Sequence, residues 1–357
     1  MNILYINNSL NLDDDTKCIL KLCKELKNKN KIIVASSGGE LVSEFINIGI
    51  KHYTIKRSNI LFIIFNIIRI IKIVNEEKIQ LIHSHNRITS FISKIVSIFT
   101  GVKVIHTQYI CLEDKSLLTR FTFKNTNIIS VSNLVRNTLI KNYNLDKSKI
   151  TTIYNAIEIY SKNEIIDKIL LQSKEKGYFT IGQVGRNINY EGIYDFIDIA
   201  KEVISINNNV RFFLIGDRKE REEVRDYIKD KNLEDYVFTL VSKDKDIEHL
   251  KYMDLMLLCY YVEELPLTPI EAFSQRIPVV AANLPGTSEE IINGVNGYLV
   301  PIKDIKSFAK RINELYYDEE LYKSLKRGAY RSYFQNYTIE KYISSHLKFY
   351  KKVLKGK

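Results

Sequence analysis

Residues 255–283 read LMLLCYYVEELPLTPIEAFSQRIPVVAAN. An apolar run of strand length is followed by a polar loop, a short helical stretch and a second apolar, β-branched run. Two buried strands joined through a helix predict a βαβ unit with parallel strands. In doubly wound sheets the ligand binds beyond the carboxyl ends of the strands, so the loop after Tyr260 is where we look for chemistry.

The same alternation fills the chain and starts twice. In the first half, strands are predicted at residues 2–7, 31–36, 81–85, 103–107, 128–131 and 151–154, with helical segments between most of them. The pattern restarts at Tyr178, with strands at residues 178–185, 211–216, 237–241, 255–260 and 278–283. The sequence therefore predicts two parallel sheets.

A chain of 357 residues is longer than one hydrophobic core usually supports, which also favours two domains. We expect an N-terminal α/β domain at 1–160, a linker at 161–177 and a C-terminal α/β domain at 178–335, with a cleft between the two sheets. Helical spacing from about Asp304 onward predicts terminal helices that close the fold. For the last one, at 336–357, a return to the N-terminal domain is one option.

Composition places the chain among ordinary globular proteins, with 45% hydrophobic and 27% charged residues. The four cysteines form no CxxC pair and no His cluster at metal-ligand spacing, which fits reduced thiols in a cytoplasmic protein. The first residues, MNILYINNSL, are typical of a buried strand and lack the pattern of a signal peptide.

The net charge of +11 lies almost entirely in the first half, where residues 1–160 hold 22 Lys and Arg against 12 Asp and Glu. Such a surplus attracts an anionic membrane, nucleic acid or a phosphorylated substrate, although a composition rich in Lys, Ile and Asn is basic by default. The basic residues are scattered rather than clustered on one face with aromatic residues, so we do not expect nucleic acid as a partner.

The most apolar stretch, residues 60–74, reads ILFIIFNIIRIIKIV and is too short to span a bilayer. Asn66, Arg69 and Lys72 recur at every third position, which places them along one face of a helix with isoleucine and phenylalanine over the rest. Two interpretations stay open: a helix packed on the first domain, and a helix that lies in a membrane interface.

The segment 263–272, EELPLTPIEA, has the features of a ligand loop that leads into a helix. Thr268 is predicted to cap the helix, with Pro269 at its first position and Glu271 three residues after the cap. Free backbone N–H groups and the helix dipole favour a diphosphate at such a start. Glu263 and Glu271 would then accept hydrogen bonds from sugar hydroxyls on either side, although capping alone also explains Glu271.

Two further loops follow predicted strands on the same edge. In GQVGRNINYEG, residues 182–192, glycine permits close approach of a ligand to the backbone, and Arg186 is placed to bind phosphate oxygens. In PGTSEEII, residues 285–292, Thr287 and Glu290 repeat the capping-box spacing. For both loops a purely structural role is the alternative.

In the first half, His83, His85 and His106 lie at the ends of predicted strands, where they either contact substrate or serve as hydrogen-bonded framework. They show no metal-ligand spacing. Residues 13–15 are three aspartates ahead of the first helix, and we expect them to interact with its positive end rather than with a metal ion.

Together these segments resemble the family 4 glycosyltransferases, a retaining family of the GT-B fold with two Rossmann-like domains, over almost the whole chain. The sharpest match is the E-x7-E element, Glu263 to Glu271, followed by EAFSQRIPVVAANLPGTSEEII. VSNLVRNTLI, Asn155 in IYNAIE and GVNGYLVP at 294–301 also match, in the same order.

The resemblance implies transfer of a sugar from a UDP- or GDP-sugar, with retention and without a metal ion or other cofactor. It implies that Glu271 binds the ribose, that Glu263 lies by the donor sugar and that Arg186 neutralises the diphosphate. The candidate donor-site residues are Gly185, Arg186, Glu263, Leu265, Pro266, Leu267, Thr268, Glu271 and Arg218, with Glu263 and Arg186 as the catalytic ones. The candidate acceptor residues are His85, His106, Tyr109, Asn155 and Asp15.

The acceptor implied is a glycan or a polyprenyl-linked sugar, bound by the basic first domain, with peripheral contact to an anionic membrane as an option. Several departures from the family bear on activity. The usual Gly-Gly of the first loop is absent, and residues 11–16 stand in its place. Glu191 stands where a diphosphate-binding lysine is usual, Glu264 replaces a glycine, and Tyr109 replaces a frequent histidine. The rival hypothesis is therefore a catalytically weak homologue that binds nucleotide sugar and supports another transferase.

Overall fold

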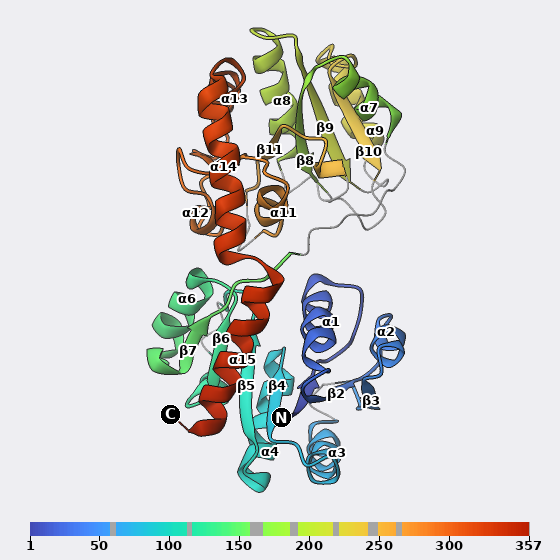
Figure 1. The fold of residues 1–357 in the computed structure, drawn as a ribbon, viewed down its shortest axis with the longest axis vertical. Coiled ribbons are helices and arrows are strands. Elements are labelled where there is room, and N and C mark those ends of the chain that lie inside the picture. Colours follow the sequence, from blue (N-terminus) through green and yellow to red (C-terminus); the bar gives the residue numbers. More distant parts are fainter. Residues whose placement is uncertain are drawn as a thin grey trace. The chain divides into compact units, whose positions relative to one another are not determined.

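The fold was analysed in a computed structural model, which describes residues 1–57, 62–112, 116–157, 167–185, 192–216, 221–241, 249–261 and 266–356. The chain forms two compact units (Figure 1). The first unit contains Met1–Ala156 together with Ile339–Lys357, and the second contains Ile157–Thr338. Each unit is built on its own parallel sheet.

The sheet of the first unit has seven strands in the order β3-β2-β1-β4-β5-β6-β7, all parallel. The strands are β1 (Asn2–Ile6), β2 (Lys31–Ser36), β3 (Lys51–Thr54), β4 (Leu81–Ser84), β5 (Lys103–Gln108), β6 (Asn127–Ser130) and β7 (Ile150–Thr152). The helices are α1 (Asp14–Leu26), α2 (Val42–Asn47), α3 (Ile63–Glu76), α4 (Arg87–Thr100), α5 (Leu117–Phe123), α6 (Asn133–Tyr143) and α15 (Ile339–Lys355).

The core of this unit has two layers, one on each face of the sheet, because successive side chains of a strand point to opposite faces. Ile3 and Tyr5 of β1 point into a layer covered by α1 and α15, whereas Leu4 and Ile6 point into the opposite layer, covered by α3 and α4. A strand buried on both sides therefore has to be apolar throughout. The run ILYI meets this requirement.

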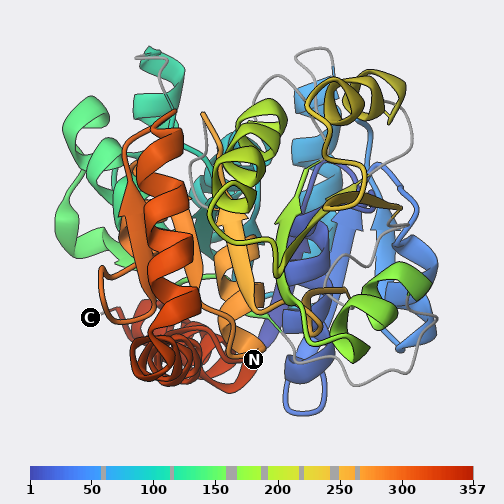
Figure 2. The same ribbon diagram turned by 90° about the horizontal axis from the view of Figure 1, so that it is seen from above.

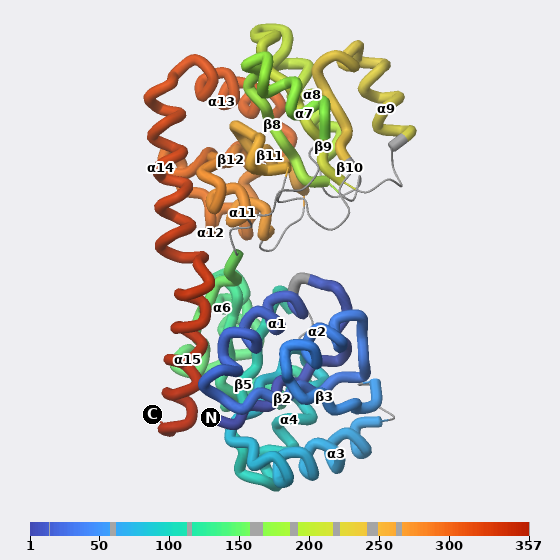
Figure 3. The backbone as a smooth tube through the Cα atoms, turned by 45° about the vertical axis from the view of Figure 1, so that its right-hand side comes forward, coloured from blue at the N-terminus to red at the C-terminus, as the bar shows by residue number. Residues whose placement is uncertain are grey.

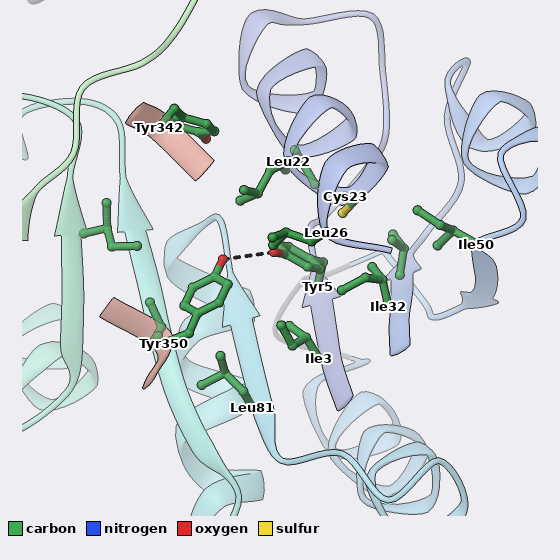
Figure 4. Packing of buried hydrophobic residues seen from close by; sticks show 14 of the residues in the cluster. Ile3, Tyr5, Leu22, Cys23, Leu26, Ile32, Ile50, Leu81, Tyr342 and Tyr350 are labelled. Carbon is green, nitrogen blue, oxygen red and sulfur yellow. Dashed lines mark hydrogen bonds between the residues drawn. The ribbon is translucent and has the colours of Figure 1, made fainter. Parts of the chain in front are cut away.

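The last helix, α15, completes the first layer. Tyr350 is fully buried there, and its hydroxyl lies 3.0 Å from the Tyr5 hydroxyl (Figure 4). Tyr342, Phe349 and Val353 of the same helix belong to the same hydrophobic cluster. The helix at the C-terminal end of the chain is thus part of the unit that holds the N-terminus, as the tube in Figure 3 also shows.

Helix α3 packs on the sheet with a face that differs from the predicted one. Asn66, expected to share a polar face with Arg69 and Lys72, is fully buried and bonds both the N–H and the carbonyl oxygen of Lys56 at 3.0 Å. Isoleucine and phenylalanine side chains of the helix are exposed instead. The physical reason is that a buried amide is tolerated where the backbone satisfies it.

The second unit has a six-stranded parallel sheet in the order β10-β9-β8-β11-β12-β13. Its strands are β8 (Phe179–Val184), β9 (Val210–Gly216), β10 (Val237–Val241), β11 (Leu255–Leu258), β12 (Val279–Ala282) and β13 (Gly297–Val300). Its helices are α7 (Lys168–Glu175), α8 (Ile193–Ile204), α9 (Arg221–Asp230), α11 (Thr268–Ser274), α12 (Thr287–Glu290), α13 (Ile305–Tyr317) and α14 (Glu319–Asn336).

Helices α8 and α13 lie side by side on one face of this sheet (Figure 2). The segment expected as a linker, 161–177, contains α7, whose Leu170 is buried and whose Lys174 forms a 2.6 Å ion pair with Asp254 of the second unit. The prediction of two parallel, doubly wound sheets is confirmed, and strands β3 and β13 are additions that the sequence analysis did not predict.

Candidate active site

The second sheet has a topological switch point between β8 and β11. From β8 the chain continues to β9 and β10 on one side, and then to β11, β12 and β13 on the other. Ligands of open α/β sheets bind at such a point, beyond the carboxyl ends of the two strands. Gly185 directly follows β8, and the segment that begins α11 follows β11. Most of the residues predicted for the donor therefore follow, in the sequence, the two strands that flank the switch point, whereas Arg218 follows β9.

The ends of β8 and β11 are tied together by hydrogen bonds. The Tyr260 hydroxyl donates to the Val184 carbonyl oxygen at 3.0 Å, and the Cys259 N–H donates to Oε1 of the fully buried Gln183 at 3.2 Å. Buried polar groups that are satisfied in this way fix the backbone around them. These bonds hold the ends of β8 and β11 together at the edge where the donor is predicted to bind.

Two glycines, Gly185 and Gly192, stand on either side of residues 186–191 between β8 and α8. A Cβ on Gly185 would lie 3.2 Å from a methyl group of Leu214. At Gly192, which precedes α8, φ is +61° and a Cβ would lie 2.0 Å from the carbonyl oxygen of Cys259. Only glycine combines this left-handed conformation with such a close approach. Gly192 is therefore required at its position, whereas a larger residue at Gly185 would crowd the Leu214 side chain.

Helix α11 begins one residue earlier in register than predicted. Leu267 is the N-cap, Thr268 and Pro269 are the first helical residues, and no side chain caps the helix. The prediction that Thr268 is the N-cap is wrong, because Thr268 already has helical geometry and is buried. Glu271 lies in the first turn of α11 and is partly exposed. Pro266, just before the helix, is buried.

Several predicted donor residues lie outside the described residues. They are Arg186, Arg218, Glu263 and Leu265; Glu191 and Glu264, which depart from the family pattern, also lie outside the described residues.

Sequence reasoning missed a polar cluster on the same edge. Asp195 in the first turn of α8 is hydrogen bonded to Tyr261, and Lys303 lies with its Nζ 4.8 Å from the centroid of the Tyr261 ring. Burial raises the pKa of Asp195 against the opposing effects of Tyr261 and Lys303, and the pKa of Tyr261 rises to about 12. The only signal in the sequence was the position of Tyr261 just after a strand.

The third predicted loop is a structural turn at Thr287. Its hydroxyl donates to the Ala282 carbonyl oxygen at 2.6 Å and accepts from the Leu284 N–H at 3.0 Å, and the side chain is fully buried. Gly286, not Thr287, is the N-cap of α12. The capping box predicted for Thr287 and Glu290 is therefore wrong.

The first sheet has its own switch point, between β1 and β4. Asp15 lies in the first turn of α1, after β1, and His85 directly follows β4. Tyr109 follows the neighbouring strand β5, and its hydroxyl lies 2.9 Å from Nδ1 of His85. Asp15 is among the charged groups close enough to raise the pKa of Tyr109, after burial and Tyr342. Three of the predicted acceptor residues thus gather at one switch point.

The histidines of this unit differ in what their ring nitrogens contact. His83 bonds the Tyr350 hydroxyl and the Thr107 hydroxyl, both at 2.7 Å. His106 bonds the Ser90 hydroxyl at 2.6 Å and Oε1 of Gln108 at 2.9 Å. In these two residues both nitrogens are used by the framework.

His85 is different. Its Nδ1 contacts Tyr109, but Nε2 is buried and has no hydrogen-bond partner among the residues that the structure describes. Oδ1 of Asn155, after β7, is also buried without a partner within the same set. A buried polar atom left unsatisfied costs about 1–3 kcal/mol unless a ligand or water supplies the missing bond. Among the predicted acceptor residues, these two atoms have unused bonding capacity that a substrate could fill.

The histidine cluster is electrically neutral near pH 7. Burial lowers the pKa of His106 and of His346 to about 4, and it lowers the pKa of His83 and His85 well below 6.5. An imidazole at this point can accept or donate a hydrogen bond without carrying charge.

The first helix is capped as expected for the aspartates at residues 13–15. Asp13 is the N-cap of α1, and its carboxylate accepts from the Thr16 N–H at 2.7 Å. Across the described parts of the chain, no group of three or more His, Cys, Asp or Glu side chains is arranged to hold a metal ion. Over the same residues, none of the helices has both the length and the apolarity that a membrane crossing requires.

Two Rossmann-like units of this topology define the GT-B class of glycosyltransferases, and solved glycosyltransferase structures share the fold. The sequence shows which family of this class the chain belongs to. Residues 16–160 match the model described as Glycosyltransferase Family 4, and residues 162–332 match that of Glycosyl transferases group 1. The chain belongs to the family 4 glycosyltransferases, and the resemblance predicted from the E-x7-E segment is confirmed.

Three bacterial proteins are among the curated relatives of this chain. A UDP-Gal:alpha-D-GlcNAc-diphosphoundecaprenol alpha-1,3-galactosyltransferase of Escherichia coli is 27% identical over 265 residues, 68% of this chain and 68% of that protein. The capsular polysaccharide biosynthesis glycosyltransferase CapM of Staphylococcus aureus is 24% identical over 83% of this chain and 82% of its own. An N-acetyl-alpha-D-glucosaminyl L-malate synthase of Bacillus anthracis is 26% identical over 80% of this chain and 77% of its own.

Solved structures match over the full length. A glycosyltransferase of Rickettsia africae has a TM-score of 0.85 at 20% identity, covering 100% of this chain and 99% of that one. Alr3699/HepE of Anabaena in complex with UDP has a TM-score of 0.84 at 17% identity, covering 99% and 100%. At these identities the likeness establishes the fold.

Proposed function

We propose that this chain is a retaining glycosyltransferase that moves a sugar, of hexosyl type, from a UDP- or GDP-sugar to a saccharide or lipid-linked acceptor. The assembly of a surface polysaccharide or glycolipid is the proposed context, on the cytoplasmic side of the cell membrane. The observation that carries the proposal is the match of two glycosyltransferase family models to residues 16–160 and 162–332, which together cover most of the chain.

The donor is assigned to the second unit. Gly185 and the start of α11 come from the strands on either side of its switch point, where a nucleotide diphosphate is expected in this topology. We assign Glu271, in the first turn of α11, to the ribose hydroxyls, and Glu263 to the donor sugar. A carboxylate suits both tasks because it accepts hydrogen bonds from two neighbouring hydroxyls.

We assign the neutralisation of the negative charge on the leaving diphosphate to Arg186 and Arg218. A guanidinium binds phosphate oxygens in a bidentate manner and keeps its charge at every physiological pH. Positive charge placed where negative charge develops lowers the barrier of the transfer step, and no metal ion is needed for this in the proposal. Pro266, Leu267 and Thr268 would shape the backbone of the diphosphate site.

The acceptor is assigned to the first unit. Nε2 of His85 is buried and free to bond a hydroxyl group of the acceptor, and Nδ1 is held by Tyr109. The neutral imidazole can accept the proton of that hydroxyl as a hydrogen bond. Asp15 and Asn155 supply further polar groups at the carboxyl edge of this sheet, and His106 supports them from within the framework.

The relatives guide the choice of substrates to test. The Escherichia coli relative is named for UDP-Gal as donor and for a GlcNAc-diphosphoundecaprenol acceptor, and structures of the Anabaena protein contain UDP and UDP-glucose. A uridine donor and a polyprenyl-linked acceptor are therefore the first candidates for this chain.

A thermal-shift panel of UDP, GDP and their sugars tests the donor, because a ligand that binds the folded state raises its melting temperature. We expect one nucleotide sugar to stabilise the protein, and Glu271→Gln to weaken its binding about tenfold or more, since a hydrogen bond to a charged group contributes about 1.5–3 kcal/mol. Glu320→Gln on α14, an exposed glutamate, is the matched control and should bind normally. Equal affinities of the two variants would contradict the assignment of Glu271.

The alternative function is a catalytically weak homologue that binds nucleotide sugar and supports another transferase. Glu191 in place of the usual lysine favours it, because a negative charge near a leaving diphosphate is unfavourable. Sugar transfer from labelled donors, measured for the native chain and for Glu191→Lys, separates the two. Turnover by the native chain supports the transferase, and no turnover until the substitution is made supports the weak homologue.

A further inference from the structure

Three neighbouring helices of the first unit expose an unusual number of large apolar side chains. Helix α3 packs against α4, and α4 packs against α5; α3 and α4 lie side by side in Figures 1 and 3. The exposed residues are Ile64, Phe65 and Ile68 on α3, Ile88, Ile98 and Phe99 on α4, and Leu117, Leu118 and Phe121 on α5. We call this set the α3–α5 surface.

These apolar side chains are not exposed because the helices lack a buried face. α3, for example, also has apolar residues that pack on the sheet, the buried Ile70, Ile73 and Val74. On the opposite side of the same helix, Ile64 is 74% exposed and Ile68 is 64% exposed. A helix of a globular protein ordinarily presents polar residues to water on that side. Large apolar patches of this kind mark surfaces that bind a partner or a membrane.

The charges around the surface are almost all positive. α4 and α5 carry Arg87, Lys94 and Arg120 and, within their own residues, no acid. In α3 the first acidic residue is Glu76, at its end, where it pairs with Lys72. Apart from Glu76, the charged residues within these three helices are all basic.

Two lysines lie directly on aromatic rings of the region. Nζ of Lys56 is 5.8 Å from the ring centroid of Phe65. Nζ of Lys94 is 4.9 Å from that of Phe121, and it also donates hydrogen bonds to the carbonyl oxygens of Phe121, Thr122 and Lys124, so Lys56 is the better candidate of the two for a lipid phosphate. Long basic side chains beside apolar ones are typical of the membrane interface, where the stem contacts acyl chains and the ammonium group reaches the phosphates.

We propose that the α3–α5 surface docks the protein on an anionic lipid bilayer, with the apolar side chains inserted at the level of the headgroups and the basic ones on lipid phosphates. α3 has 14 residues, too few to cross a bilayer, so it lies in the plane of the interface. A second copy of the chain fits less well, because a two-fold contact would bring the same cations face to face.

This inference goes beyond the proposed function, since it concerns where the enzyme works and not which donor it uses. It supplies a reason for a membrane-bound acceptor to reach the first unit. Nucleotide binding by the second unit is a separate property, so either can fail without the other.

The test uses the full chain and sedimentation with vesicles of phosphatidylcholine, with and without phosphatidylglycerol. We expect binding to the anionic vesicles, weaker binding at high salt, and little binding to phosphatidylcholine alone. The double variant Ile64→Glu, Ile68→Glu should bind at least about tenfold more weakly, because it removes two apolar anchors and adds repulsion. Thermal shift with the best nucleotide sugar shows in the same samples that each variant is folded.

The matched control is Ile46→Glu, Ile206→Glu. These isoleucines are 55% and 61% exposed, lie on α2 and after α8, and receive the same change in charge. Retained binding of the control together with loss in the α3 variant supports the proposal. Equal binding of both variants, or no binding of the native chain to anionic vesicles, overturns it. So does self-association that is abolished by the α3 variant in the absence of vesicle binding, because the surface would then be an interface between copies.

Discussion

Acidification to pH 5 is expected to destabilise the first unit, because its buried histidines are held neutral. The pKa of His106 and of His346 is about 4 in the folded unit, against about 6.5 in an unfolded chain. Between these values the unfolded chain binds more protons than the folded one, so the free energy of unfolding falls as the pH falls. His83 and His85 act in the same direction, since burial lowers their pKa as well.

The magnitude follows from the two values. For one group with a pKa of about 4 folded and 6.5 unfolded, stability at pH 5 is about 2 kcal/mol lower than at pH 7.5, so two such groups remove about 4 kcal/mol. Carboxylates contribute little in this window. The pKa of Glu77, for example, is lowered to about 2 by its contacts with Lys31, Lys51 and Tyr53, so its contribution is lost only below its unfolded value of 4.5.

Urea unfolding followed by circular dichroism at several values between pH 7.5 and pH 5 measures the effect. His346→Asn removes one titrating group, and its amide can still reach the Tyr342 carbonyl oxygen that Nδ1 of His346 contacts at 2.9 Å. Between pH 7.5 and pH 5, the free energy of unfolding of this variant should fall by about 2 kcal/mol less than that of the native chain. Parallel curves for the two proteins would show that His346 is not held neutral by burial, and the reasoning would be refuted.

Three other substitutions have definite expected outcomes. Gly192→Ala should lower the melting temperature of the second unit and weaken nucleotide binding, because the new Cβ would lie 2.0 Å from the Cys259 carbonyl oxygen; thermal shift measures both effects. Glu77→Gln should cost about 1–3 kcal/mol in urea unfolding, since it removes the charge that binds two lysines at 2.6 Å. Tyr350→Phe should cost a similar amount by leaving Nδ1 of buried His83 without its hydroxyl partner.

The architecture was predictable because its signal is local. Apolar runs such as ILYI and VVAA, each followed by a helical period, specify buried parallel strands without knowledge of their neighbours. The strand β3, KHYT, escaped prediction because it lies at the edge of its sheet, where exposed and half-buried residues give no apolar run.

The details of the site were less predictable, because they depend on residues distant in the sequence. The side of α3 that faces the sheet is decided by Asn66, whose amide is satisfied by the backbone of Lys56 in a preceding loop. Which histidine has a free nitrogen is decided by Tyr350, 267 residues after His83, and by Tyr109. Sequence patterns identify the residue types, whereas tertiary contacts decide which of their atoms are available.

Helix α15 is translated last, although it packs on the unit that is translated first. Residues 1–156 are translated first. The hydrophobic cluster around Tyr5 lacks Tyr342, Phe349, Tyr350 and Val353 until the whole second unit has been translated. While about half the chain is translated, this face of the N-terminal sheet is therefore covered only in part, by α1 and α2. A premature stop close to the C-terminal end would expose the oldest part of the nascent protein to aggregation and proteolysis.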